Sequence, residues 1–195
     1  MTQTLEIEFK NILTKSEYER LLEFFKIEKE AIFAQENHYF DTSDFQLKQK
    51  GAALRIREKD QQFELTLKQP FQEGLLETNV LLSPHVAQLA FSKNLLPEGE
   101  IEKLIEEMGI PFSKLKYFGS LLTKRAEVKD ANGLFVLDYS SYLKKEDYEL
   151  EYEVENYQRG QAFFNEFLAK HGIPKRETKN KIQRFYDRKY SMMDL

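Results

Sequence analysis

Cysteine is absent from the 195-residue sequence. This excludes disulfide bonds, thiolate nucleophiles and zinc sites built from thiolates. No apolar stretch approaches the roughly 18 residues of a membrane-spanning helix, and the N-terminus lacks the basic segment and apolar run of a signal peptide. We therefore expect a soluble, cytoplasmic protein without a membrane partner.

A strong excess of one charge is also missing. The formal net charge is −4, although 32% of the residues are charged. A nucleic-acid-binding surface needs clustered positive charge, and the basic stretch KRETKNKIQRFYDRK is diluted by acidic residues, so we expect no nucleic-acid partner. The phosphate-binding loop G-x-x-x-x-G-K-[ST] is absent, and the histidines are scattered without metal-ligand spacing.

Short strand patterns recur through the sequence instead. They lie at 5–10, 37–42, 52–60, 62–70, 75–82, 116–130, 131–143 and 147–155. Helical periodicity appears at 14–29, 83–96, 98–109 and 159–172, and Thr14 and Glu17 have the spacing of a capping box. No linker or low-complexity tract divides the chain, which predicts one α+β domain over residues 1–195.

The strands carry their charges on one face. Residues two apart share a face of a strand, so Glu6, Glu8 and Lys10 form an ionic row opposite apolar neighbours. The same alternation aligns Arg55, Arg57 and Lys59; Glu64, Thr66 and Lys68; Glu77 and Asn79; Thr123, Arg125 and Glu127; Asp138; and Glu149, Glu151 and Glu153. An open antiparallel sheet with one solvated face would give this pattern as well.

Three features favour a closed sheet over an open one. About seven strands repeat the charged row while only about four helices are available to cover them. Arginine lies among Leu and Ile in LRIR. Charges of opposite sign also lie on different predicted strands, the acidic ones at Glu6, Glu8, Asp138, Glu149 and Glu151 and the basic ones at Arg55, Arg57, Lys68 and Arg125. We predict a closed antiparallel β-barrel of about eight strands, with the rows lining a polar tunnel and helices packed outside.

Such a tunnel would need a ligand, because an unpaired buried charge costs several kcal/mol. Converging Arg and Lys side chains bind a polyanion, most naturally phosphate groups. Carboxylates bind hard divalent cations such as Mg²⁺ or Mn²⁺, which bridge to phosphate oxygens. The two kinds of row together predict a metal-assisted polyphosphate site.

The ordered set of motifs resembles the CYTH superfamily, the triphosphate tunnel metalloenzymes. LEIEFK resembles the ExExK signature, and the resemblance continues through LRIRE, LTLKQ, LLETNV, TKRAEV, FVLDYS with ELEYEVE, and NKIQRF. It covers essentially the whole chain. It implies a tunnel that binds triphosphate-bearing substrates through basic residues and divalent metal through acidic residues.

The resemblance also implies a role for each matching position. The metal ligands would be Glu6, Glu8, Asp138, Glu149 and Glu151; Glu153 shares their parity, so the register of the last strand stays open. The phosphate ligands would be Lys10, Arg55, Arg57, Lys68, Arg125 and Lys181, with Lys179 as the rival of Lys181. Glu77 would face the tunnel, and the catalytic residues would be Glu6, Glu8, Lys10 and Arg57.

The activity expected from this resemblance is metal-dependent hydrolysis of a phosphoanhydride. The substrate would be inorganic triphosphate, thiamine triphosphate or a nucleoside triphosphate, with arginines stabilising the transferred group and metal activating water. Adenylate cyclase activity on ATP and a non-catalytic polyphosphate- or nucleotide-binding module are the alternatives. A monomer and a homodimer are both compatible with the sequence.

Overall fold

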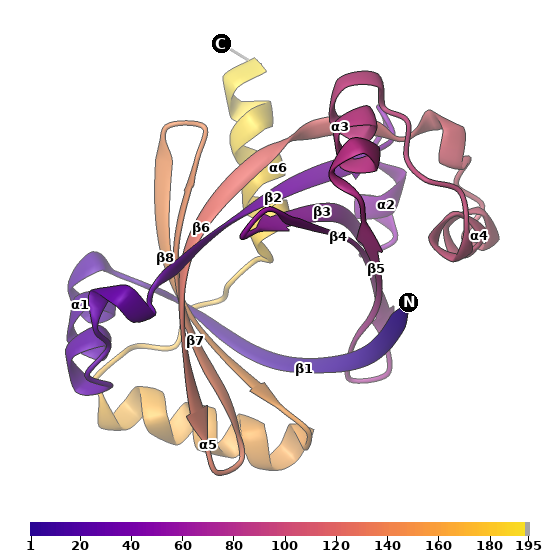
Figure 1. The fold of residues 1–195 in the computed structure, drawn as a ribbon. Helices are drawn as coiled ribbons and strands as arrows, with labels where there is room; N and C mark the ends of the chain where they lie inside the picture. The colour runs from indigo at the N-terminus through magenta and orange to yellow at the C-terminus, as the bar shows by residue number, and fades with distance from the viewer. Residues whose placement is uncertain (194–195) are drawn as a thin grey trace. The chain divides into compact units, whose positions relative to one another are not determined.

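A computed structural model describes residues 1–193, which form eight strands and six α-helices (Figure 1). The elements are β1 (Thr2–Leu13), α1 (Lys15–Phe24), β2 (Phe33–Asp41), α2 (Gln46–Gln49), β3 (Ala53–Lys59), β4 (Gln62–Phe71), β5 (Gly74–Leu82), α3 (Pro84–Lys93), α4 (Glu100–Glu107), β6 (Lys116–Asp130), β7 (Gly133–Tyr142), β8 (Lys145–Val154), α5 (Tyr157–Lys170) and α6 (Lys181–Met193). Short 3₁₀ turns lie at Lys29–Ala31 and Phe112–Lys114. None of the helices in this described part is both long and apolar enough to cross a membrane.

The strands form a closed barrel in the order β1-β5-β4-β3-β2-β6-β7-β8. The predicted α+β class with a closed antiparallel barrel is confirmed. By its internal contacts the chain divides into two compact units. Unit 1 comprises residues 1–5 and 35–121, and unit 2 comprises residues 6–34 and 122 onward.

Unit 1 is an antiparallel meander of β2, β3, β4 and β5 covered on one face by helices. Leu54 and Ile56 of β3 and Leu65 and Leu67 of β4 are almost fully buried, and they belong to one apolar cluster with residues of α3 and α4. Because side chains alternate along a strand, the residues between these positions lie on the opposite face. That opposite face carries the predicted basic residues of this unit.

Unit 2 places β6, β7, β8 and most of β1 beside α1 and α5. Its core is rich in aromatic rings, among which Phe135 packs against Tyr152 and Phe167. The predicted capping box is present at the start of α1: the Glu17 backbone N–H donates to Thr14, and the Glu17 carboxylate accepts from the Thr14 backbone.

Helix α6 was not predicted from the sequence. Its buried residues Ile182, Phe185 and Tyr186 have the spacing of one helix face. Charged and polar residues interrupt this apolar stripe, so the sequence pattern did not indicate a helix. The helix positions Lys181 and Arg184, which are both buried among carboxylates in unit 2.

Candidate functional site

The basic residues predicted in unit 1 occupy the face opposite its helices. Residues directly opposed in an antiparallel ladder point to the same side. The register pairs Arg57 with Glu64, and Lys68 with Glu77. Arg55 lies opposite Thr66, between these two pairs. The predicted cations of β3 and β4 therefore lie on one polar surface.

One carboxylate, Glu77, is shared by two of these cations. The Lys68 ammonium forms an ion pair with Glu77, and Arg55 Nη2 lies 3.9 Å from Glu77 Oε1. Burial alone would raise the pKa of Glu77, but the Lys68 and Arg55 charges outweigh it and lower that pKa to about 2. The Arg55 Nε is buried and has no hydrogen-bond partner. This buried donor fits an additional anionic acceptor.

Arg57 is held in place by an amide that the sequence reasoning missed. Its Nε donates to Asn37 Oδ1 of β2 over 3.3 Å, and Asn37 lies directly opposite Arg57 in the β2–β3 ladder. An asparagine in the strand pattern at 37–42 gave no signal of this contact. The register between two strands was needed to find it.

The acidic residues predicted in unit 2 come from neighbouring strands. Glu8 lies directly opposite Glu153 in the β1–β8 ladder, and Lys10 lies opposite Glu151. The Lys10 ammonium pairs with Glu8 and donates to Asn180 Oδ1 over 2.9 Å. Burial would lower the pKa of Lys10, but the charges of Glu8 and Glu151 raise it.

Most of the other predicted carboxylates are paired with cations of unit 2. Asp138 accepts two hydrogen bonds from Arg125, at 2.8 and 2.6 Å, and Arg125 also reaches Glu151 at 2.9 Å. The Lys181 ammonium lies 2.8 Å from Asp138, 3.0 Å from Glu149 and 2.5 Å from Glu151. Burial would raise the pKa of Glu151, but the charges of Lys181 and Arg125 hold it well below its usual range.

Lys181 and Lys179, the two alternatives for one predicted phosphate ligand, occupy different environments. Lys181 is buried among three carboxylates, and burial alone would lower its pKa, but those carboxylates raise it well above the usual value. Lys179 pairs with Asp187 on the surface, and its side chain is 64% exposed. Only Lys181 lies in the carboxylate network.

Arg184 is a member of this network that the sequence reasoning missed. It donates to Glu149 at 2.6 Å and to Asp147 at 3.0 Å, and Asp147 also accepts from the Tyr142 hydroxyl. The sequence contained a signal for this contact: Arg184 follows Lys181 by three positions, so on a helix the two side chains lie on the same face.

Glu153 differs from the paired carboxylates. Burial and the nearby charges of Glu6, Glu151 and Glu8 raise the pKa of Glu153 to about 7, and Arg125 offsets only part of this effect. Near neutral pH, added positive charge at this position would therefore be favourable. Glu149 also has a buried oxygen, Oε1, without a hydrogen-bond partner.

These carboxylates fit a divalent metal by their chemistry. Carboxylate oxygens are the donors that Mg²⁺ and Mn²⁺ prefer. The raised pKa of Glu153 and the unpartnered Glu149 Oε1 are both features that a cation would relieve. Within residues 1–193, however, no three acidic or histidine side chains already converge in the arrangement of a metal site.

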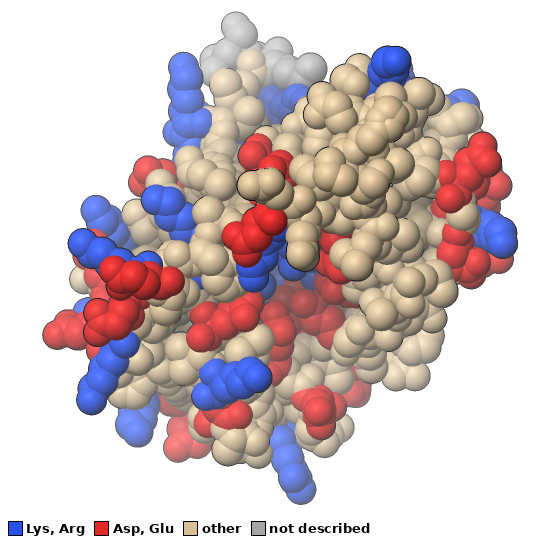
Figure 2. All heavy atoms as spheres, in the orientation of Figure 1, with Lys and Arg blue, Asp and Glu red and all other residues tan. Residues whose placement is uncertain are grey.

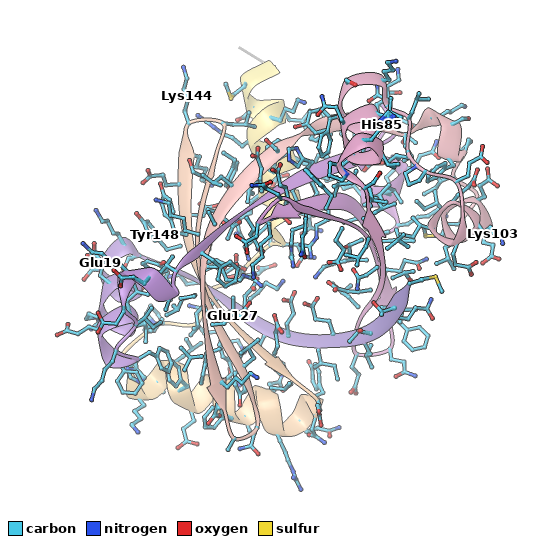
Figure 3. The ribbon with its side chains drawn as sticks, viewed as in Figure 1. Glu19, His85, Lys103, Glu127, Lys144 and Tyr148 are labelled. Carbon is cyan, nitrogen blue, oxygen red and sulfur yellow. The ribbon has the colours of Figure 1, made fainter. Side chains whose placement is uncertain are left out.

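One face of the molecule shows mixed charge on its surface. Figure 2 shows Lys and Arg interspersed with Asp and Glu on the viewed face, with no extended basic area there. Glu19 of α1, Lys103 of α4 and Lys144 of the β7–β8 turn point away from the strands (Figure 3), and His85 of α3 is exposed. These side chains contrast with the buried ion pairs of both units.

Comparison with known proteins identifies the family of this chain. The CYTH domain matches residues 4–186. The chain belongs to the CYTH domain family. Over 190 residues it is 48% identical to a Bacillus subtilis (strain 168) protein named "Putative triphosphatase YjbK", with 97% of this chain and 98% of that protein covered.

Two solved structures share this fold. A Bacillus halodurans protein described as a "putative adenylate cyclase (bh2851)" is 44% identical, with a TM-score of 0.91 over 95% of this chain and all of that one. HpAC1 from Hippeastrum, described as a "putative adenylyl cyclase" with a dominant triphosphatase activity, is 23% identical with a TM-score of 0.75. It covers 94% of this chain and 95% of its own, and at this identity it supports the fold alone.

Proposed function

We propose that this CYTH protein is a divalent-metal-dependent hydrolase of a triphosphate-containing substrate. The observation that carries the proposal is that each unit contains a buried polar group which its own ion pairs do not satisfy, a basic group in unit 1 and an acidic group in unit 2. Unit 1 has a basic surface whose Arg55 Nε lacks a partner, and unit 2 has a carboxylate whose pKa rises to about 7 beside other carboxylates. A phosphate chain suits the first surface, and a divalent cation suits the second.

The phosphate ligands in this proposal are the predicted basic residues. Arg55 and Arg57 of β3 and Lys68 of β4 share one face of unit 1 and would bind phosphate oxygens by charge-assisted hydrogen bonds. Arg125 and Lys10 would do the same from unit 2, where neighbouring carboxylates keep both side chains protonated. Positioned cations of this kind stabilise the charge that develops in phosphoryl transfer.

The metal ligands that we favour are Glu6, Glu8 and Glu153. Glu8 and Glu153 are directly opposed, and the charge of Glu6 contributes to the raised pKa of Glu153. A bound Mg²⁺ or Mn²⁺ would offset phosphate charge and lower the pKa of a bound water. Asp138 and Glu151 would orient Arg125, which both of them contact. Glu149 would contribute through its unpartnered Oε1.

A second candidate function is adenylate cyclase activity. The 44% identical Bacillus halodurans structure is described as a putative adenylate cyclase. A cyclase acting on ATP would use the same proposed phosphate and metal ligands. The products distinguish the reactions. A cyclase releases cyclic AMP and pyrophosphate from ATP, whereas a hydrolase releases orthophosphate.

The test is phosphate release from inorganic triphosphate, thiamine triphosphate and ATP, each with Mg²⁺ or Mn²⁺. Glu6→Gln removes a proposed metal ligand, and Arg57→Ala removes a proposed phosphate ligand. Each should lower kcat/KM by about 10²- to 10³-fold. The matched controls are Glu19→Gln and Arg159→Ala, because both residues are exposed outside the site; they should leave the rate unchanged.

The thermal unfolding of every variant would show whether it still folds. Metal-dependent phosphate release that falls in both site variants and in neither control would support the hydrolase. Release of cyclic AMP and pyrophosphate from ATP would replace it with the cyclase. Tight triphosphate binding without turnover of any of the three substrates would leave a binding module.

A further inference from the structure

Arg184, near the start of α6, connects three parts of unit 2 through its guanidinium group. Its Nε donates to Asp147 Oδ2 over 3.0 Å, and its Nη2 donates to Glu149 Oε2 over 2.6 Å. Its Nη1 donates to the backbone carbonyl of Lys179 over 2.5 Å. Each nitrogen of the guanidinium group therefore has a defined partner, which fixes the orientation of the group.

The residues that make these contacts lie in the interior of unit 2. Asp147 and Glu149 are two residues apart on β8, so their side chains leave the strand on the same face. Arg184, Asp147 and Glu149 are 8%, 9% and 1% exposed. The next residue of α6, Phe185, is almost fully buried and packs against Tyr142 with ring centroids 5.9 Å apart. This packing holds the start of α6 against the β7–β8 hairpin.

Further contacts fix Asp147, which in turn fixes Arg184. The Tyr142 hydroxyl donates to Asp147 Oδ2, the same oxygen that accepts from Arg184. The Lys145 ammonium lies 3.4 Å from the other oxygen, Oδ1. A continuous series of hydrogen bonds therefore runs from Tyr142 through Asp147 and Arg184 to Glu149.

Glu149 is held at one of its two carboxylate oxygens. Arg184, at 2.6 Å, and Lys181, at 3.0 Å, both contact Oε2. The other oxygen, Oε1, is buried and has no hydrogen-bond partner within residues 1–193. A buried carboxylate oxygen in this state is costly unless a donor or a cation completes it. Contacts that occupy Oε2 therefore leave Oε1 available to a cation.

We propose that Arg184 is a positioning residue that holds Glu149 through Oε2 and so presents Oε1 to the divalent cation. This inference rests on the proposed function, in which Glu149 contributes through Oε1. Removal of a side chain that orients a metal ligand typically lowers metal affinity by about 10- to 100-fold. Arginine suits this role because its planar group can bind several partners in fixed directions, whereas a lysine ammonium is a point charge on a flexible stem.

The sign of the effect distinguishes positioning from simple electrostatics. Arg184 is a cation, so by its charge alone it repels a divalent metal near Glu149. On this basis the uncharged variant Arg184→Met would bind the metal more tightly. If Arg184 positions the carboxylate, the same variant leaves Glu149 without its fixed orientation and binds the metal more weakly. The two explanations therefore predict opposite changes.

The test measures Mn²⁺ binding by isothermal titration calorimetry without substrate, so it requires no turnover. Arg184→Met should raise the dissociation constant by about 10- to 100-fold. Arg184→Lys should raise it as well, because a lysine cannot reproduce all three contacts. The matched control is Arg188→Met, which removes an arginine from the same helix. The Arg188 Nε donates to the Leu143 carbonyl over 3.3 Å, so this control should leave the constant unchanged.

Tyr142→Phe provides a milder variant that keeps the inference testable if the Arg184 variants do not fold. It removes the hydroxyl that holds Asp147 and keeps the ring that packs against Phe185. The loss of this more distant hydrogen bond should raise the Mn²⁺ dissociation constant by about threefold. Thermal unfolding in EDTA would show which variants fold. If only Tyr142→Phe folds, an unchanged constant in that variant would overturn the inference.

The wild-type measurement separates this inference from the proposed function. Mn²⁺ binding by wild type with an equal or smaller dissociation constant in folded Arg184→Met would overturn the positioning role and leave the metal-dependent hydrolase intact. Equal weakening in Arg184→Met and Arg188→Met would also overturn it, because the effect would then belong to α6 as a whole. Wild type that does not bind Mn²⁺ would overturn both this inference and the metal dependence on which it rests.

Discussion

The pairing of Glu17 with Arg176 gives a quantitative test of how unit 2 holds the segment before α6. Arg176 Nη1 and Nη2 donate to the two Glu17 carboxylate oxygens at 2.8 and 2.9 Å, and Nη1 also donates to the Ile12 carbonyl. The Arg176 backbone N–H donates to Asn11 at 2.7 Å. This connection ties the C-terminal segment that leads to Lys181 onto β1 and α1.

The pKa of Glu17 sets the size of the expected effect. The hydrogen bonds from Arg176, and secondarily from the Thr14 backbone, lower this pKa from about 4.5 to about 2. A shift of this size corresponds to about 3 kcal/mol at most, and partial exposure of Arg176 reduces it to about 2 kcal/mol. Because the folded pKa is lowered, this stability is present above about pH 4.5 and is lost as the pH falls toward 2.

A double-mutant cycle measures the coupling between the two side chains. Glu17→Gln, Arg176→Met and the double variant would be unfolded in urea at pH 7 and again at pH 3.5. We expect a coupling free energy of about 1.5–2 kcal/mol at pH 7 and a clearly smaller one at pH 3.5. Equal coupling at both pH values, or coupling below about 0.5 kcal/mol at pH 7, would refute the reasoning.

Two further predictions concern unit 2. The pKa of Glu153 is raised to about 7 in the folded protein, so the native state loses stability as the pH rises from about 4.5 to 7. Glu153→Gln should therefore raise the free energy of unfolding by about 1 kcal/mol at pH 8 and leave it unchanged at pH 4.5. Urea titrations in the absence of divalent metal measure both values. Lys181→Met leaves three buried carboxylates without this partner and should cost about 3–5 kcal/mol by thermal or urea unfolding. The matched variant Lys179→Met removes only an exposed pair and should cost less than about 1 kcal/mol; equal losses would show that burial of the network does not matter.

The strand faces could be read from the sequence because they depend only on alternation. Leu54, Ile56, Leu65 and Leu67 had to lie opposite the charged residues between them, and the structure buries them together. The capping box at Thr14 was equally local, since it requires two residues three positions apart. Both features follow from a single strand or helix.

The pairing of one strand with another could not be read in this way. Glu149, Glu151 and Glu153 share a face, so alternation does not separate them. They are separated by the β1–β8 register, which sets Glu153 opposite Glu8, and by α6, which brings Lys181 and Arg184 to Glu149. Both depend on contacts between distant segments, and α6 itself was hidden by its charged residues.

The two polar surfaces differ in how fully the protein satisfies their charges. In unit 2, Asp138 and Glu151 each receive two cations, so these carboxylates need no ligand to stay ionised. At Glu153 the positive charge of Arg125 does not outweigh burial and the charges of Glu6, Glu151 and Glu8, so the pKa of Glu153 is raised. In unit 1, Arg55 retains a buried donor without an acceptor.

The residual charges of the two surfaces are therefore of opposite sign. A fold selected for stability alone gains nothing from an unpaired buried donor or a half-protonated carboxylate, because each costs free energy that an apolar side chain would not. Under the function proposed above, a divalent cation would compensate Glu153 in unit 2, and phosphate oxygens would accept from Arg55 in unit 1. Substitutions at Arg55 and Glu153 therefore test the proposed function at two groups that the described side chains leave unsatisfied.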